Sequence, residues 1–174
     1  MNFQISKVIE ILSQTPRTLK SLLKDLSEEH VYARIDEDSW SPFDIVGHLI
    51  HGEETDWIAR SEIILSGAQD VTFEPFDRFA QYEISKGKTL GELLDRFQML
   101  RARNIEKLRS WDLSDKQLEL KGLHPDFGKV TLRQLLATWM VHDLNHIRQI
   151  VTVLAKQHVD GVGPWKEYLS ILKD

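Results

Sequence analysis

The sequence predicts an all-α protein, a four-helix bundle with short extra helices in the connections between the main helices. Three observations predict this fold: apolar residues recur every three or four positions over long stretches, helix start signals precede these stretches, and no segment alternates as a β-strand would. The 174 residues, of which 41% are hydrophobic and 28% charged, have the composition of an ordinary globular protein. We expect a single domain over residues 1–174.

The first predicted helix is interrupted. Thr15-Pro16 falls inside its apolar pattern, and proline lacks the backbone N–H that a helix interior needs. We therefore expect one segment near residues 3–13 and another near 17–26.

The second predicted helix runs from residue 43 to about residue 65 and ends before Gly67. Its start is marked by Ser41 as the N-cap, Pro42 at the first helical position and Asp44 at the third. These residue types satisfy the free backbone donors of a first turn, so this helix start is well specified.

The second half of the chain contains two more long helices. Capping-box patterns at Thr89–Glu92 and Thr131–Gln134 predict their starts, and a third box at Ser114–Gln117 predicts a shorter helix. The connection at 68–88 is too aromatic for a free linker, so we expect it to pack over one end of the domain.

Two histidines stand four residues apart in the last long helix. His142 and His146 project from the same helix face, one turn apart, as two ligands of one metal ion would. They belong to a stripe with a spacing of three or four residues: Leu135, Trp139, His142, His146, Ile150 and Val153. Burying two imidazoles in an apolar stripe costs free energy unless each finds a partner, and a metal ion would satisfy both.

The second helix offers a third ligand. His48 shares a face with Ile45 and Gly52 and should point into the bundle, whereas His51 is turned roughly 60° toward the edge of that face. Three histidine ligands would leave a coordination position open, as in catalytic zinc sites. Three buried, hydrogen-bonded histidines without a metal are the alternative.

Composition excludes several classes of protein. The net charge is −5 and no block of Lys and Arg stands out, which argues against nucleic-acid binding. No apolar run approaches the length of a membrane span, and the chain begins without a signal-like segment, so we expect a cytoplasmic protein. The chain has no cysteine, so a metal site must use His, Asp or Glu, and a catalytic thiol must come from outside.

In several segments the sequence resembles the DinB-like superfamily, a group of metal-binding four-helix bundles named after a DNA-damage-inducible protein. The resemblance covers essentially the whole chain. The segments that carry it are Trp40-Ser41-Pro42 with Gly47-His48-Leu49, His124-Pro125-Asp126-Phe127-Gly128 before Thr131-Leu132, the segment 142–150, and Gly163-Pro164-Trp165-Lys166-Glu167-Tyr168-Leu169.

The resemblance implies a metal ligand set and a class of chemistry. The family's ligands correspond to His48, His142 and His146, and the family implies zinc or nickel and often a homodimer. Relatives include S-transferases that activate the thiols bacillithiol or mycothiol, and a mycothiol-dependent isomerase. The metal would act as a Lewis acid that lowers the pKa of a thiol or of water.

Three functions remain open, each with a small molecule as partner. The first, which we favour, is a metal-dependent transferase that uses a low-molecular-weight thiol such as bacillithiol. The second is a metal-dependent hydrolase with water as the nucleophile. The third is a protein that binds a ligand at its metal without turnover. Fold alone does not choose among them.

Other polar residues have two interpretations each. Glu53 and Asp56 either line the site or belong to a solvated helix face, and Asp143 and Asn145 are expected to make capping or supporting contacts. His124 either orients a substrate or belongs to a turn.

The remaining candidates are cationic or neutral side chains farther along the chain. Arg101 and Arg103 could meet an anionic thiol, but solvated helix residues explain them as readily. His30 and His158 are expected at the surface.

Overall fold

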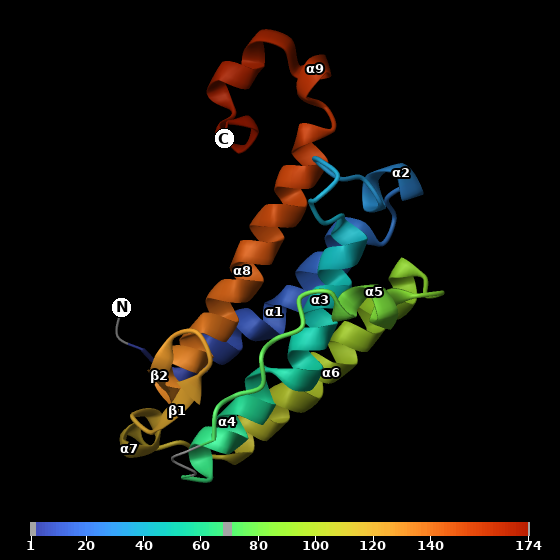
Figure 1. Ribbon diagram of the computed structural model, residues 1–174. Coiled ribbons are helices and arrows are strands. Elements are labelled where there is room, and N and C mark those ends of the chain that lie inside the picture. Colours follow the sequence, from blue (N-terminus) through green and yellow to red (C-terminus); the bar gives the residue numbers. More distant parts are fainter. Residues whose placement is uncertain (1–2, 68–70, 174) are drawn as a thin grey trace.

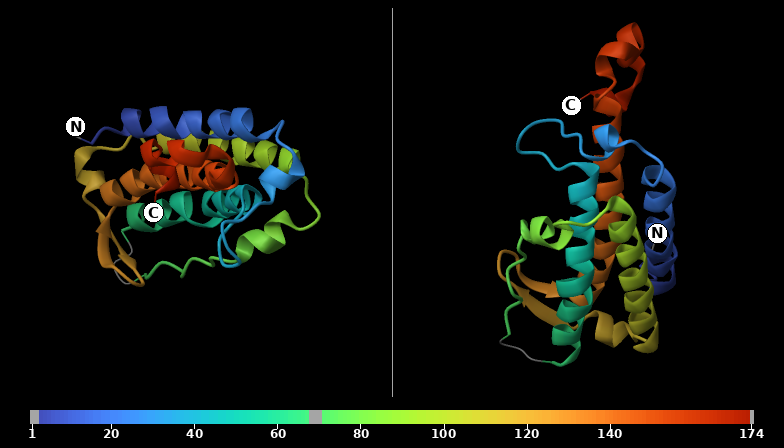
Figure 2. Two further views of the ribbon diagram at one scale, coloured as in Figure 1. Left: turned by 90° about the horizontal axis from the view of Figure 1, so that it is seen from above. Right: turned by 90° about the vertical axis from the view of Figure 1, so that its right-hand side faces the viewer.

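The computed structural model describes residues 3–67 and 71–173, and it confirms the all-α four-helix bundle (Figure 1). The order around the bundle is α1, α6, α3 with α4, and α8, as the view along it shows (Figure 2). The main helices are α1 (Ile5–Leu23), α3 (Pro42–Thr55), α4 (Trp57–Leu65), α6 (Leu90–Ser110) and α8 (Leu132–Lys156).

Short elements occupy the connections and the C-terminal segment. They are α2 (Glu28–Val31), α5 (Ala80–Ser85), α7 (Asp115–Leu118), α9 (Val159–Val162), and the 3-10 helices η1 (Gly163–Tyr168) and η2 (Ser170–Leu172). An antiparallel hairpin, formed by β1 (Lys121–His124) and β2 (Gly128–Thr131), is present in addition to the predicted helices. Strands of four residues are too short to show an alternating pattern.

The predicted break in the first helix is wrong, because α1 continues through Pro16. Proline leaves the carbonyl of Leu12 without its helical donor. Arg101 from α6 supplies the missing hydrogen bond, with its Nη1 atom 2.9 Å from that oxygen. A side chain distant in sequence therefore makes the proline tolerable in a helix interior.

The start of α3 confirms the prediction for the second helix. The Ser41 side chain accepts from the Asp44 backbone, and the Asp44 carboxylate accepts from the Ser41 backbone, which completes a capping box after which Pro42 begins the helix. The predicted single helix is divided at Asp56, where α3 ends and α4 begins. Capping boxes at Thr89, Ser114 and Thr131 start α6, α7 and α8 as predicted.

The described part of the connection before α6 runs along the flank of α3 and α4 rather than over one end of the bundle (Figure 1). Phe73 is buried in the core, and α5 packs against α3. Gly47 makes this close packing possible, since a Cβ atom there would lie 2.3 Å from Ser85 Oγ. The segment forms a wall beside the inward-facing part of α3.

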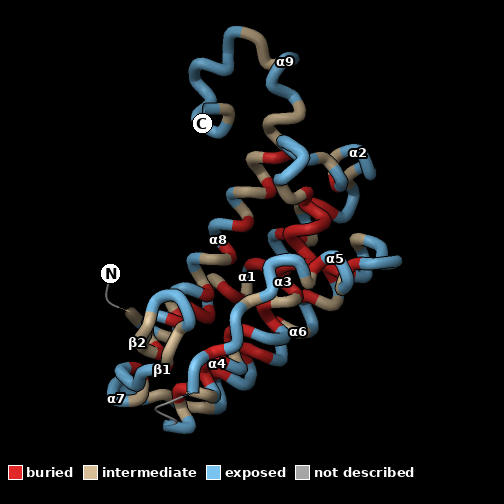
Figure 3. Tube along the Cα trace, in the orientation of Figure 1, coloured by how far each residue is buried: buried red, intermediate tan, exposed pale blue. Residues whose placement is uncertain are grey.

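The C-terminal segment lies beyond the bundle. Figure 3 shows that the burial of α8 does not continue into α9, η1 and η2, where no described residue is buried. In the described residues, no helix combines the length and apolar character needed to cross a membrane.

Candidate metal centre

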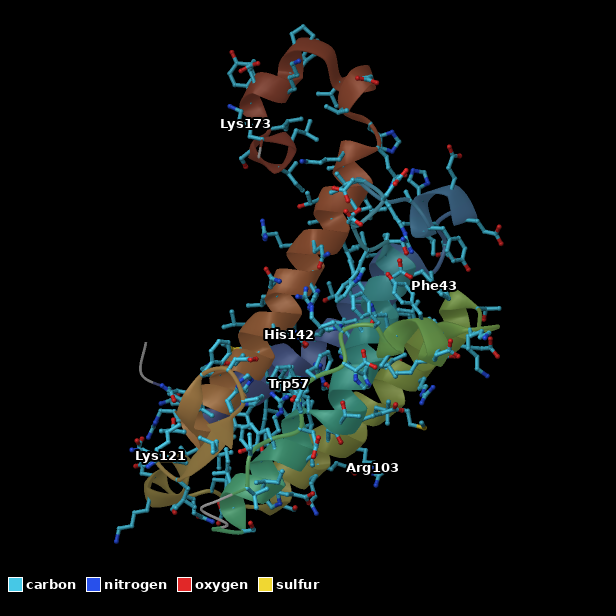
Figure 4. The ribbon with its side chains drawn as sticks, viewed as in Figure 1. Phe43, Trp57, Arg103, Lys121, His142 and Lys173 are labelled. Atoms are coloured by element: carbon cyan, nitrogen blue, oxygen red, sulfur yellow. The ribbon has the colours of Figure 1, made fainter. Side chains whose placement is uncertain are left out.

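Three histidines from two helices meet inside the bundle. His48 lies on α3, and His142 and His146 lie on α8. The Nε2 atom of His142 is 3.1 Å from that of His48 and 3.1 Å from that of His146. Figure 4 shows His142 on the side of α8 that faces α3. The structure therefore brings together all three residues that the sequence singled out, with one ring nitrogen each within 4.8 Å of the others.

Burial keeps these imidazoles neutral. It lowers the pKa of His48 to about 3 and that of His142 to about 2, and in both cases the neighbouring histidines lower it further. Burial also lowers the pKa of His146, although a hydrogen bond to Gln149 acts in the opposite direction. Neutral imidazole is the form that binds a metal ion.

The three nitrogens fit a metal ion better than they fit each other. A neutral ring nitrogen carries either one proton or one lone pair, so His142 Nε2 cannot satisfy hydrogen bonds to both neighbours. A cation would accept one lone pair from each ring. Tetrahedral zinc, with Zn–N bonds of about 2.0–2.1 Å, separates its ligand nitrogens by roughly 3.3 Å, close to the 3.1 Å that separates His142 Nε2 from each of the other two.

The second ring nitrogens bear on which tautomer each histidine adopts. His146 Nδ1 lies 2.9 Å from Gln149 Oε1, an acceptor, so Nδ1 carries the proton and Nε2 is left with its lone pair toward the other rings. The Nδ1 atoms of His48 and His142 are buried and have no hydrogen-bond partner among the described residues. Their tautomers therefore follow whatever binds at Nε2.

Aromatic rings enclose the three histidines. Trp40 packs on His48 with ring centroids 4.7 Å apart, Phe76 meets His48 at 5.3 Å, and Trp57 stands edge-on to His142 at 5.1 Å. This setting lowers the local polarity, which strengthens electrostatic interactions at the site. His51 lies outside the triad and packs on Phe76, in agreement with its predicted place at the edge.

One side of the site opens into a pocket of about 950 Å³. His48 and His146 line it together with Trp40 and Phe76. Its polar lining comes from several segments and includes both acidic and basic side chains: Asp38, Ser39, Arg60, Arg78, His124, Asp126, Asn145 and Gln149. The pocket is within the size range of small-molecule sites, and it places His124 and Asn145 on the same cavity as two of the histidines.

Behind the histidines lies a buried polar network centred on Arg101. Its guanidinium makes two hydrogen bonds to Asp143, of 2.6 and 3.0 Å, and one of 2.8 Å to Glu53. Trp139 and Asn104 also donate to the Glu53 carboxylate. The interpretation of Arg101 and Glu53 as solvated residues is wrong, because their side chains are 1% and 0% exposed. The expectation of a supporting contact for Asp143 is correct.

Electrostatics keep this network ionic at its centre. Burial opposes a charge on Arg101, but Glu53 and Asp143 outweigh it and raise the pKa of Arg101 above its ordinary value. Burial raises the pKa of Glu53 in spite of the nearby guanidinium. Since Asp143 is the chain neighbour of His142, the network fixes the part of α8 that carries the metal pair.

The other candidates are distributed as follows. Asp56 is buried and paired with Arg60 at the junction of α3 and α4, and burial raises its pKa to about 6 even though Arg60 lowers it. Arg103 is exposed. His30 and His158 lie away from the metal centre with their Nε2 atoms 3.2 Å apart; His158 is exposed, as expected, and His30 is half-buried.

Comparison with known families decides the classification. A sequence model described as the DinB superfamily matches residues 11–150. The chain belongs to the DinB superfamily. The match includes all three histidines of the candidate metal centre. A search of curated proteins gave no match.

Solved structures share the fold of this DinB protein. YfiT from Bacillus subtilis, described as a probable metal-dependent hydrolase with an unusual four-helix bundle topology, is 24% identical, with a TM-score of 0.75 over 88% of this chain and 87% of that chain. The DinB-like protein YjoA from Bacillus subtilis is 17% identical, with a TM-score of 0.54 over 87% and 92%. TT2238, a four-helix bundle protein, is 16% identical, with a TM-score of 0.53 over 84% and 98%.

Proposed function

We propose that this DinB protein is a metal-dependent enzyme whose divalent ion is held by His48, His142 and His146. One observation carries the proposal: three neutral imidazoles bring one ring nitrogen each within 4.8 Å of the others, beside an open pocket. Either zinc or nickel suits three imidazole ligands.

Each part of the site has a defined task. The ion would supply Lewis-acid chemistry that lowers the pKa of a nucleophile near neutral pH. Trp40 and Phe76 shield the histidines, and Gln149 holds the ring of His146 in its ligand tautomer. The pocket admits the reactants from the side lined by His48 and His146.

A low-molecular-weight thiol such as bacillithiol is the nucleophile we favour. The chain has no cysteine of its own. A pocket of about 950 Å³ is at the upper end of the range for small-molecule sites, which suits a thiol cofactor bound together with an electrophilic substrate. This supports a thiol S-transferase.

Hydrolysis is the second candidate. YfiT, whose fold this chain shares, is described as a probable metal-dependent hydrolase. With water as nucleophile, the same three histidines would serve, and no added thiol would be needed.

Metal content tests the site itself. The wild-type protein should bind one equivalent of zinc or nickel, measured by elemental analysis, and His48→Ala and His146→Ala should lose it while remaining folded. His51→Ala is the matched control on the same helix and should keep the metal. A wild-type protein that stays metal-free after incubation with both ions contradicts the proposal.

Thiol dependence separates the two reactions. A set of electrophiles is assayed on the metal-loaded protein with and without bacillithiol. Turnover only with thiol supports the transferase, and equal turnover without it supports the hydrolase. Stoichiometric metal with no turnover in either assay would leave a ligand-binding protein.

A further inference from the structure

His124 is a side chain of the pocket to which the proposed metal chemistry assigns no role. It is the last residue of β1, opposite Gly128 in the hairpin, and it lines the pocket that His48 and His146 also line. Gly128 adopts a φ of 69°, the left-handed conformation that lets the chain turn back here. The hairpin thereby brings a histidine from outside the bundle to the substrate side of the metal centre.

The turn fixes the proton on the ring of His124. The backbone N–H groups of Asp126 and Phe127 both donate to Nδ1, at 3.1 and 3.4 Å. Since Nδ1 accepts, the neutral ring must carry its proton on Nε2. Burial lowers the pKa of His124 and Arg60 lowers it further, against Asp126, which favours the neutral ring.

Packing fixes the direction of the ring as well. Phe127 stacks on it with ring centroids 4.4 Å apart, and Phe73 stands edge-on at 6.3 Å. The Nε2 atom has no hydrogen-bond partner in the described part of the chain. It is not among the buried side-chain atoms that lack a partner, so it remains accessible. The side chain as a whole is 17% exposed. A single oriented N–H donor is therefore available to a molecule in the pocket.

We propose that His124 recognises a carbonyl or carboxylate oxygen of the substrate by donating a hydrogen bond from Nε2. The proposal rests on the proposed function only in placing that substrate at the metal centre. The aromatic rings of Phe76, Phe79 and Phe127 on the same pocket suit an apolar or aromatic body attached to that oxygen. The substrate class is thus an apolar molecule with an acceptor oxygen, and His124 is a positioning residue for it.

Two substitutions separate donation to a ligand from support of the turn. In His124→Asn the amide oxygen can accept the backbone N–H groups as Nδ1 does, but nothing replaces the Nε2 donor. In His124→Gln the longer amide can place an N–H near the Nε2 position, but the turn loses its acceptor. His124→Asn therefore removes the Nε2 donor and keeps the acceptor of the turn, whereas His124→Gln keeps a donor and removes that acceptor.

Benzoate is the probe, and benzylammonium, which has donors but no acceptor, is the control of similar size. Binding to the zinc-loaded protein is measured by titration. We expect His124→Asn to weaken benzoate binding roughly tenfold, the effect of a lost hydrogen bond to a charged acceptor, with little change in Tm or metal content. His124→Gln should bind benzoate within about threefold of wild type but unfold at a lower temperature. Neither variant should change the binding of benzylammonium.

A purely structural histidine gives the reverse order, with His124→Asn binding as wild type and His124→Gln impaired, and that result overturns the proposal. Nitrogen NMR of the wild-type ring is a second readout. It should show the proton on Nε2 and a shift of that resonance when benzoate is added; a proton on Nδ1 also overturns the proposal. A protein that binds no metal would contradict the proposed function but not the role of His124, because the NMR measurement on His124 can be made on the metal-free protein.

Discussion

At the residue scale, the metal centre consists of histidine side chains whose surroundings disfavour their charged form. Histidine is charged at mildly acidic pH in an unfolded chain, yet His48 is buried and His142 half-buried, among aromatic rings and beside each other. Burial holds their pKa values at about 3 and about 2, far below the ordinary 6.5. Without a cation the site therefore costs stability, and this cost depends on pH.

The sign of that dependence follows from proton binding. Below pH 6.5 the unfolded chain binds protons that folded His48 and His142 do not, so the free energy of unfolding of the metal-free protein falls as the pH falls. The slope attributable to each histidine approaches about 1.4 kcal/mol per pH unit. We expect His48→Gln to reduce the slope between pH 6.5 and 5, measured by urea unfolding in the presence of a chelator.

A histidine outside the site supplies the comparison. His158→Gln, at an exposed position outside the metal centre, is measured beside His48→Gln as the control for replacing a histidine. Equal slopes for His48→Gln and the wild type would show that His48 titrates in the folded protein as it does in the unfolded chain.

At the scale of secondary-structure elements, one arginine joins four of the main helices, α1, α3, α6 and α8. Arg101 of α6 donates to the Leu12 carbonyl of α1, to Glu53 of α3 and to Asp143 of α8. Its guanidinium also lies 5.3 Å from the Trp139 ring centroid. The helices that carry the three histidines, α3 and α8, are thus tied to α1 and α6.

Removing the charge of Arg101 should lower the stability of the protein strongly. Arg101→Met leaves the carboxylates of Glu53 and Asp143 buried without their cation, which typically costs about 3–5 kcal/mol. We expect a loss of stability of that size in urea unfolding, together with weaker metal binding, because Asp143 adjoins His142.

The same substitution at an exposed site on the same helix is the control. Arg103→Met should change the free energy of unfolding by less than about 0.5 kcal/mol, since Arg103 is exposed and makes no ion pair within the described residues. If Arg101→Met were as stable as the control, the network would be dispensable.

At the scale of the whole molecule, the C-terminal segment formed by α9, η1 and η2 exposes large aromatic side chains. Trp165 and Tyr168 are 70% and 87% exposed, and Val141 and Leu144 on α8 are 55% and 44% exposed. Large aromatic residues exposed in this way are typical of protein interfaces. The homodimer implied by the family resemblance stays a prediction, and this segment is where we expect its contacts.

Solution mass tests this expectation. Light scattering after size exclusion should give twice the mass of one chain, and Trp165→Ser combined with Tyr168→Ser should shift the protein toward the monomer without loss of helicity. Phe79→Ser, at an exposed aromatic residue distant from the segment, should leave the mass unchanged. A wild-type monomer at micromolar concentration contradicts the dimer.

Features that depend on neighbours within one helical turn could be predicted from the amino-acid sequence alone. The spacing of His142 and His146 placed them on one face, and the capping boxes marked the starts of α3, α6 and α8. Periodicity also gave the inward direction of His48. These inferences succeeded because helix geometry and capping are local.

Features that join distant parts of the chain became visible only in the folded structure. Pro16 was expected to break a helix because its compensating donor, Arg101, is 89 positions from Leu12. The sequence left a solvated position open for Glu53 and Arg101, because the partners that compensate their charges lie on different helices, 48 positions apart in the chain. His124 reached the pocket through a hairpin too short to predict. In each case a group that is costly alone became acceptable through a partner that only folding brings near.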